Sequence, residues 1–212
     1  MTTTATTTPQ AVRRAGAPYL ALAPAILVIA RLITTPISNK PRDFVADVHD
    51  SAAQTEAGAA LAIVATALLA WTLVLLARSA MAGSRRVAVA AGVLTTAGCV
   101  GMVLVSALQA IGARLSVQDL GDKQGADLFD AIYNTGALPV VAQLFIVAGV
   151  IGSICLGVAL YKREGLGRPA AIVTGVGSLL VFATAPGPIQ PFLVVAAAVA
   201  ALGYYLVGAS SD

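Results

Sequence analysis

Four polar side chains interrupt or border the long apolar stretches of this sequence. Arg31 divides the first stretch, Glu56 precedes the second, and Gln109 and Gln143 lie within the third and fourth. If these stretches cross a membrane in alternating directions, all four side chains lie toward the same outer side. A guanidinium, a carboxylate and two amides at one level would line a polar vestibule open to the outside. These four residues are the candidate ligand-binding site.

Two simpler roles are open to Arg31. At a rise of 1.5 Å per residue, it lies about 21 Å along the first helix, in the outer third of the membrane. A lone arginine costs roughly 2.5–3.5 kcal/mol at mid-bilayer and less near an interface. We therefore expect Arg31 either to extend toward the outer headgroups or to pair with Glu56 at the outer end of the next helix.

The other reactive residue types give no basis for an enzyme. His49 is the only histidine, so neither a zinc site with two histidines nor a di-histidine haem can be built. Cys99 and Cys155 are expected at depths that differ by roughly 10 Å, which exceeds the Cα separation of a disulfide. No nucleotide-binding loop or nucleophile motif is present. We expect no enzymatic activity, no cofactor and no metal site.

The composition determines which elements position these residues. The chain is 58% hydrophobic and 11% charged, whereas soluble domains carry roughly 25% charged residues. So few charges cannot cover a globule exposed to water, and lipid must solvate much of the exterior. An apolar run of about 20 residues is then read as a membrane-spanning helix. The predicted fold class is all-α, a polytopic membrane helix bundle.

Six spanning helices are predicted. Pro186, Gly187 and Pro188 divide the last apolar region into two spans, because this sequence cannot continue a helix. The Thr-rich residues 1–12 are expected to be a disordered tail, and residues 13–212 form one transmembrane domain. Its predicted spans are residues 17–36, 57–77, 87–111, 137–160, 169–184 and 191–208.

The basic residues predict the direction of these spans. With the N-terminus in the cytoplasm, the inner segments hold eight of the thirteen Lys and Arg residues but only two of the ten acids. This is the positive-inside pattern, so both termini are expected in the cytoplasm and the chain is expected to cross the cell membrane several times. The Ala, Val and Gly content is typical of a bacterial genome rich in GC. The positive net charge reflects topology and does not indicate binding to nucleic acid.

Small residues recur at close spacing in three of the later spans. In lipid, such residues let helix backbones approach closely. They serve either internal packing of the bundle or association with a second copy of the chain. The pairs are Gly98 with Gly101, Gly149 with Gly152, and Ala171 with Gly175.

Three local features resemble a family. An Asp-rich first outer loop leads into a long helix that ends Leu75-Leu76-Ala77-Arg78. Later segments read Asp127-Leu128-Phe129-Asp130, then Gly136-Ala137-Leu138-Pro139, and finally Leu156 to Arg163 followed by Gly167-Arg168-Pro169. Together they resemble the six-helix actinobacterial membrane proteins grouped as domain of unknown function 4386. The resemblance implies a six-helix membrane fold but supplies no activity and no functional residues.

Two classes of function remain. The uncharged spans and small-residue faces favour a non-enzymatic accessory or regulatory membrane protein. It would contact the lipid bilayer and either a protein partner or another copy of itself. The alternative is a small transporter or channel for neutral or lipophilic solutes, which the expected outer vestibule would serve.

Overall fold

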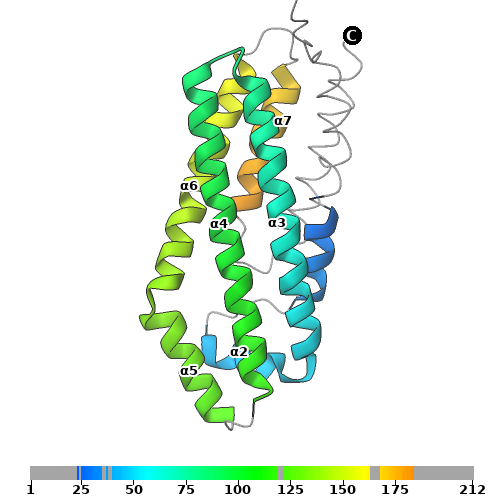
Figure 1. Cartoon of the computed structure of the whole chain (residues 1–212), viewed down its shortest axis with the longest axis vertical. Coiled ribbons are helices and arrows are strands. Elements are labelled where there is room, and N and C mark those ends of the chain that lie inside the picture. Colours follow the sequence, from blue (N-terminus) through cyan, green and yellow to red (C-terminus); the bar gives the residue numbers. More distant parts are fainter. Residues whose placement is uncertain are drawn as a thin grey trace, which may run out of the picture.

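The computed structural model describes residues 23, 25–34, 37, 40–118, 122–162 and 168–183, and within them the chain is helical with no strand. Residues 25–33 form a short helical segment that carries Arg31. The later elements are α2 (Pro41–Val48), the 3-10 helix η1 (His49–Ser51), α3 (Ala52–Ala80), α4 (Arg85–Ser116), α5 (Asp122–Thr135), α6 (Ala137–Tyr161) and α7 (Arg168–Ala183). The long helices run side by side in an elongated bundle (Figure 1).

Three helical stretches are long and apolar enough to cross a membrane: Arg42–Ala80, which includes α3, then Arg85–Ser116 and Ala137–Tyr161. A shorter apolar helix covers Ala171–Ala183. The predicted all-helical class is therefore confirmed for the described residues, and three of the helices have the length and apolar composition that a membrane crossing requires. The spans at 57–77, 87–111 and 137–160 lie inside α3, α4 and α6. The tail at 1–12 and the span at 191–208 lie outside the described residues.

Glycines bring the backbones of α4 and α6 into contact. A Cβ atom at Gly98 would overlap the Cα of Gly149, and one at Gly152 would lie 2.6 Å from the backbone nitrogen of Thr95. A Cβ at Gly149 would also lie 2.7 Å from the Phe182 ring on α7. Two apolar helices in lipid gain little free energy by burying apolar surface against each other, so close van der Waals packing must hold them together. Of the two roles open to these glycines, the contacts show internal packing of the bundle.

One end of the bundle carries a small folded unit, called the cap below, made of α2, η1 and α5 (Figure 1). Its fully buried aromatic residues are Phe44 from α2 and Phe129 from α5, whose ring centroids lie 5.4 Å apart. Val45 and Val48 complete the apolar face of α2. The connections between the predicted spans at 17–36 and 57–77 and between those at 87–111 and 137–160 are therefore largely helical where the structure describes them, because each has apolar residues at helical spacing.

Charged residues separate between the two ends of the bundle. The end opposite the cap, called the basic end below, is where α3 and α6 finish and α4 and α7 begin (Figure 1). Its described charged side chains are all basic, and the described acids all lie at the cap end. The basic-end residues are Arg78, Arg85, Arg86, Lys162 and Arg168.

Candidate functional site

Arg31 lies inside the bundle and contacts α4. Its side chain is buried, with 9% of its surface exposed. The Nη1 atom donates a hydrogen bond of 3.0 Å to the Oε1 atom of Gln109, which is also buried. Gln109 precedes the end of α4 by seven residues, so the pair lies about 10 Å inside the cap end of that helix. Two of the four candidate site residues are thus in direct contact.

The structure corrects both simpler expectations for Arg31. Because the guanidinium is buried against Gln109, it does not extend to the membrane surface. Its expected partner Glu56 instead pairs with Arg114, with 3.7 Å between Oε2 and Nη1, and both side chains are about half exposed or more. Glu56 lies near the exposed start of α3, where a carboxylate keeps much of its hydration. A buried amide on α4 is the partner that the rotation of the helices places within reach of Arg31.

The fourth candidate, Gln143, lies apart from the other three. It is exposed on α6, and among the described residues no hydrogen bond joins it to Arg31, Glu56 or Gln109. The predicted set of four is therefore divided into a buried pair, an exposed ion pair to Arg114 and an exposed amide. Which side chains on neighbouring helices meet depends on helix rotation, and matching depth alone does not determine it.

One nitrogen of the buried guanidinium has no partner. Among the described residues, Nη2 of Arg31 is the only buried side-chain nitrogen or oxygen without a hydrogen bond. Buried hydroxyls in α3, α4 and α6 instead bond to the backbone of their own helix. Thr66, Thr95 and Ser153 each donate to the carbonyl four residues earlier, over 2.7, 2.7 and 2.9 Å. An unpaired buried donor is costly, so Arg31 Nη2 is the polar atom of the described residues whose hydrogen-bonding capacity is unmet.

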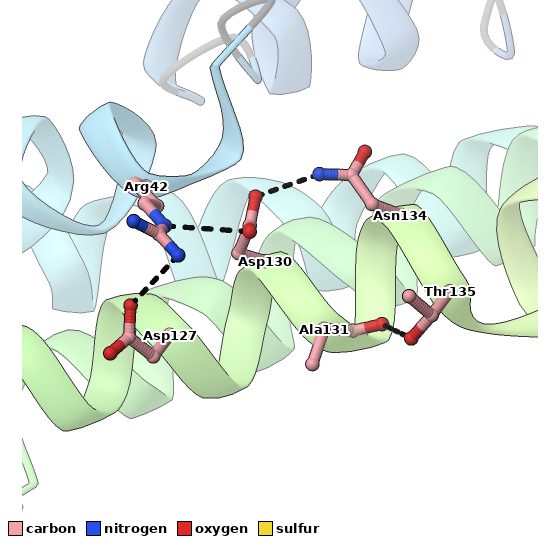
Figure 2. Close-up of polar contacts among 6 residues, drawn as sticks. All are labelled: Arg42, Asp127, Asp130, Ala131, Asn134 and Thr135. Carbon is pink, nitrogen blue, oxygen red and sulfur yellow. Dashed lines mark hydrogen bonds and ion pairs between the residues drawn. The ribbon is translucent and has the colours of Figure 1, made fainter.

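The cap contains a second polar cluster, which sequence reasoning missed. Nη2 of Arg42 lies 3.2 Å from Oδ1 of Asp127, and its Nε lies 3.4 Å from Oδ2 of Asp130 (Figure 2). Asn134 donates a hydrogen bond of 2.7 Å to Asp130, one turn away on α5. These contacts join α2 to α5 on the outside of the aromatic pair. The available signal was the helical spacing of Phe44 with Val48 and of Phe129 with Tyr133.

His49 connects the cap to the bundle. Its Nδ1 atom lies 2.6 Å from the carbonyl oxygen of Ser116, in the last turn of α4. His49 is exposed, yet it takes part in this contact. Gly112 makes a second connection, because a Cβ there would lie 2.5 Å from the Phe44 ring. The cap is therefore docked on α4 by backbone, ring and imidazole contacts.

The chain was compared with known proteins. No family model, no curated protein and no solved structure matches it. The resemblance to the domain of unknown function 4386 group therefore stays a prediction. The described residues form a helical protein with a folded cap, two polar clusters and three helices long and apolar enough to cross a membrane, and its function has to be argued from these features.

Proposed function

We propose that this protein is a non-enzymatic accessory or regulatory membrane protein that binds a partner protein through its cap. The observation that carries the proposal is the folded state of the cap. A mere connection between two spanning helices needs no core, yet here α2 and α5 bury an aromatic pair and close it with Arg42. A rigid surface loses less entropy on binding than a flexible loop.

The exposed residues in and beside the cap are of the types found in protein contact surfaces. Asp43 and Asp47 lie exposed on α2. Leu128 on α5 and Val117 after α4 are large apolar residues that remain 46% and 49% exposed. Protein interfaces combine a few exposed apolar anchors with a charged rim that directs association. We propose that the partner presents a basic surface with an apolar centre.

Purification in mild detergent followed by native mass spectrometry tests this proposal. The wild-type chain is expected to retain one partner in fixed stoichiometry. The double variant Asp43→Lys/Asp47→Lys is expected to release it, while Arg85→Glu/Arg86→Glu, a matched charge reversal at the basic end, is expected to keep it. A wild-type chain recovered without any partner, or a partner that both variants retain equally, would contradict a binding role for the cap.

Unpaired Nη2 of Arg31 favours a second candidate function, a small transporter or channel for neutral solutes. A carbonyl or hydroxyl oxygen passing this level would find a positively charged donor, with the Gln109 amide beside it. Urea or glycerol flux into proteoliposomes tests this candidate. Flux that falls in Arg31→Gln and persists in the exposed control Gln143→Ala would support it. Equal flux in wild type and both variants would remove it.

The membrane arrangement is part of the proposal. We propose six spans in the bacterial cell membrane with both termini in the cytoplasm, which places the cap outside and the basic end inside. The separation of charges along the bundle supports this direction. A cysteine introduced by Asp47→Cys should react with an impermeant maleimide in intact cells, whereas one introduced by Arg86→Cys should react only after permeabilisation. The reverse pattern would invert the topology.

A further inference from the structure

A groove lies between α6 and α7 near the basic end. It has a volume of about 330 Å³ and follows α6 from Ser153 to Lys162, which is about 13 Å of helix. Gly157 and Gly175 both line it, and a Cβ at Gly175 would lie 2.8 Å from the Cα of Gly157. The two backbones therefore touch, and the missing side chains leave a recess beside the contact.

Branched aliphatic side chains form the walls of the groove. Ile154 and Val158 stand on α6 and are 55% and 43% exposed, while Ile172 and Val176 stand on α7 and are 55% and 48% exposed. Such a surface offers nothing to a polar solute, which would lose its hydration there without gaining a hydrogen bond. A hydrocarbon chain loses nothing on entering and gains close contacts on both sides.

Polar and basic residues gather where the groove reaches the basic end. Tyr161 and Lys162 line this end, and the Arg168 guanidinium carbon lies 5.6 Å from the centroid of the Tyr161 ring. This cation–π contact holds the Arg168 charge beside the groove. Helix α7 begins at Arg168, so the positive end of its dipole lies there too. An apolar groove that ends in two cations and a phenol matches a lipid chain with an anionic headgroup.

We propose that the α6–α7 groove binds an anionic phospholipid, with one acyl chain along the groove and the phosphate held by Lys162 and Arg168. This inference is independent of the proposed function, because it concerns the opposite end of the molecule from the cap. It commits to a membrane lipid, since free phosphate would use the two cations but would leave the apolar walls empty.

Headgroup recognition is tested on the full-length protein in mild detergent by native mass spectrometry. The probes are phosphatidylglycerol and phosphatidylcholine with the same acyl chains. Lys162→Gln/Arg168→Gln is expected to weaken phosphatidylglycerol binding about 25-fold, because each basic residue near a membrane surface contributes about fivefold. The matched control Arg78→Gln/Arg85→Gln, at the same end but outside the groove, should change it less than about twofold. Equal losses in both variants would overturn the proposal by showing unspecific attraction to the basic end.

Recognition of the lipid acyl chain is tested by a substitution that fills the groove. Val158→Phe is expected to weaken binding of both lipids about tenfold. The larger side chain would displace roughly two methylene groups of the acyl chain from the groove, and their burial would be lost. Val147→Phe is the control, on the same helix and similarly exposed at 46% but outside the groove. Identical lipid binding in Val158→Phe and wild type would overturn the proposal that the groove holds the acyl chain. Unchanged thermal unfolding confirms that each variant is folded.

The identity of the occupant is tested by photo-cross-linking from a benzophenone-bearing residue placed at position 176. An adduct with phosphatidylglycerol that excess unlabelled phosphatidylglycerol suppresses supports the proposal. This readout uses the native Lys162 and Arg168, so it stays decisive if the double variant fails to fold. An adduct with residues 191–208, or with a second copy of the chain, would overturn the proposal by showing that protein fills the groove.

Discussion

In the bundle, α4 and α6 meet at glycines, whereas in the cap α2 and α5 meet at aromatic rings. Gly98 lies directly against Gly149 with no room for a methyl group, while Phe44 and Phe129 place their ring centroids 5.4 Å apart. The two regions belong to one chain and share α4 as a neighbour. Their packing differs as expected for a bundle surrounded by lipid and a cap surrounded by water.

The solvent explains the difference. Lipid tails are as apolar as leucine, so helices in a membrane gain stability from close backbone contact rather than from hiding apolar surface. Water drives large apolar rings together, so the cap buries its aromatic residues, exposes Arg42 and Asp127 and leaves Asp130 partly exposed. The polar contacts follow the same division. Inside the bundle Arg31 bonds to the buried Gln109 and the hydroxyls of Thr66, Thr95 and Ser153 bond to their own helices, whereas in the cap Arg42 forms ion pairs between two helices.

The largest effect is expected from Gly98→Leu, which places a side chain where the Gly149 backbone lies. The two helices must separate, so little folded protein should be recovered from membranes. Gly98→Ala should still destabilise the bundle by about 3 kcal/mol. The control is Gly92→Ala, whose Cβ would lie 3.3 Å from the Ala77 Cβ and needs only a small shift. Size-exclusion profiles and detergent unfolding measure both, and equal stability of the two alanine variants would refute backbone contact as the basis of packing.

Phe129→Ala should unfold the cap without unfolding the bundle. Removing a fully buried phenylalanine costs about 3–5 kcal/mol, which exceeds what two short helices can supply. Hydrogen exchange should become fast in α2 and α5 and stay slow in α4 and α6. Leu128→Ala, an exposed neighbour on α5, is the control and should leave exchange unchanged. Simultaneous loss of protection in the cap and bundle would show that they form one cooperative unit.

Gln109→Leu should destabilise the bundle by about 2 kcal/mol, because the Arg31 guanidinium then loses its hydrogen bond while it remains buried. Adding Arg31→Leu should restore at least half of that loss, since an apolar pair suits this depth better. A double-mutant cycle of thermal stability in detergent measures the coupling. Strictly additive losses would show that Arg31 and Gln109 do not depend on one another.

The smallest effect is expected from Arg42→Gln. Arg42 and Asp127 are exposed to solvent and Asp130 is partly exposed, so the loss of cap stability should not exceed about 1 kcal/mol and should shrink in high salt. Hydrogen exchange of α2 at low and high salt measures it. A loss as large as that in Phe129→Ala would mean that charge, rather than ring packing, holds the cap together.

Local sequence was sufficient to identify three helices long and apolar enough to cross a membrane, and the glycines that pack them. Hydropathy over about 20 residues needs no knowledge of neighbours, and residues 57–77, 87–111 and 137–160 accordingly lie inside α3, α4 and α6. Small residues are tolerated in a spanning helix mainly where another backbone approaches, so Gly98 and Gly149 could be recognised without coordinates.

Only the tertiary structure decided the partners of the polar residues. Arg31 and Gln109 are 78 residues apart in the chain, and the rotation and register of their helices determine whether they meet. Phe44 and Phe129 likewise come from two segments outside the predicted spans, and each segment becomes an ordered helix because the other covers its apolar face. The hydropathy needed for membrane crossing is a property of a single segment. The buried arginine, the cap and the α6–α7 groove each depend on how two segments pack together.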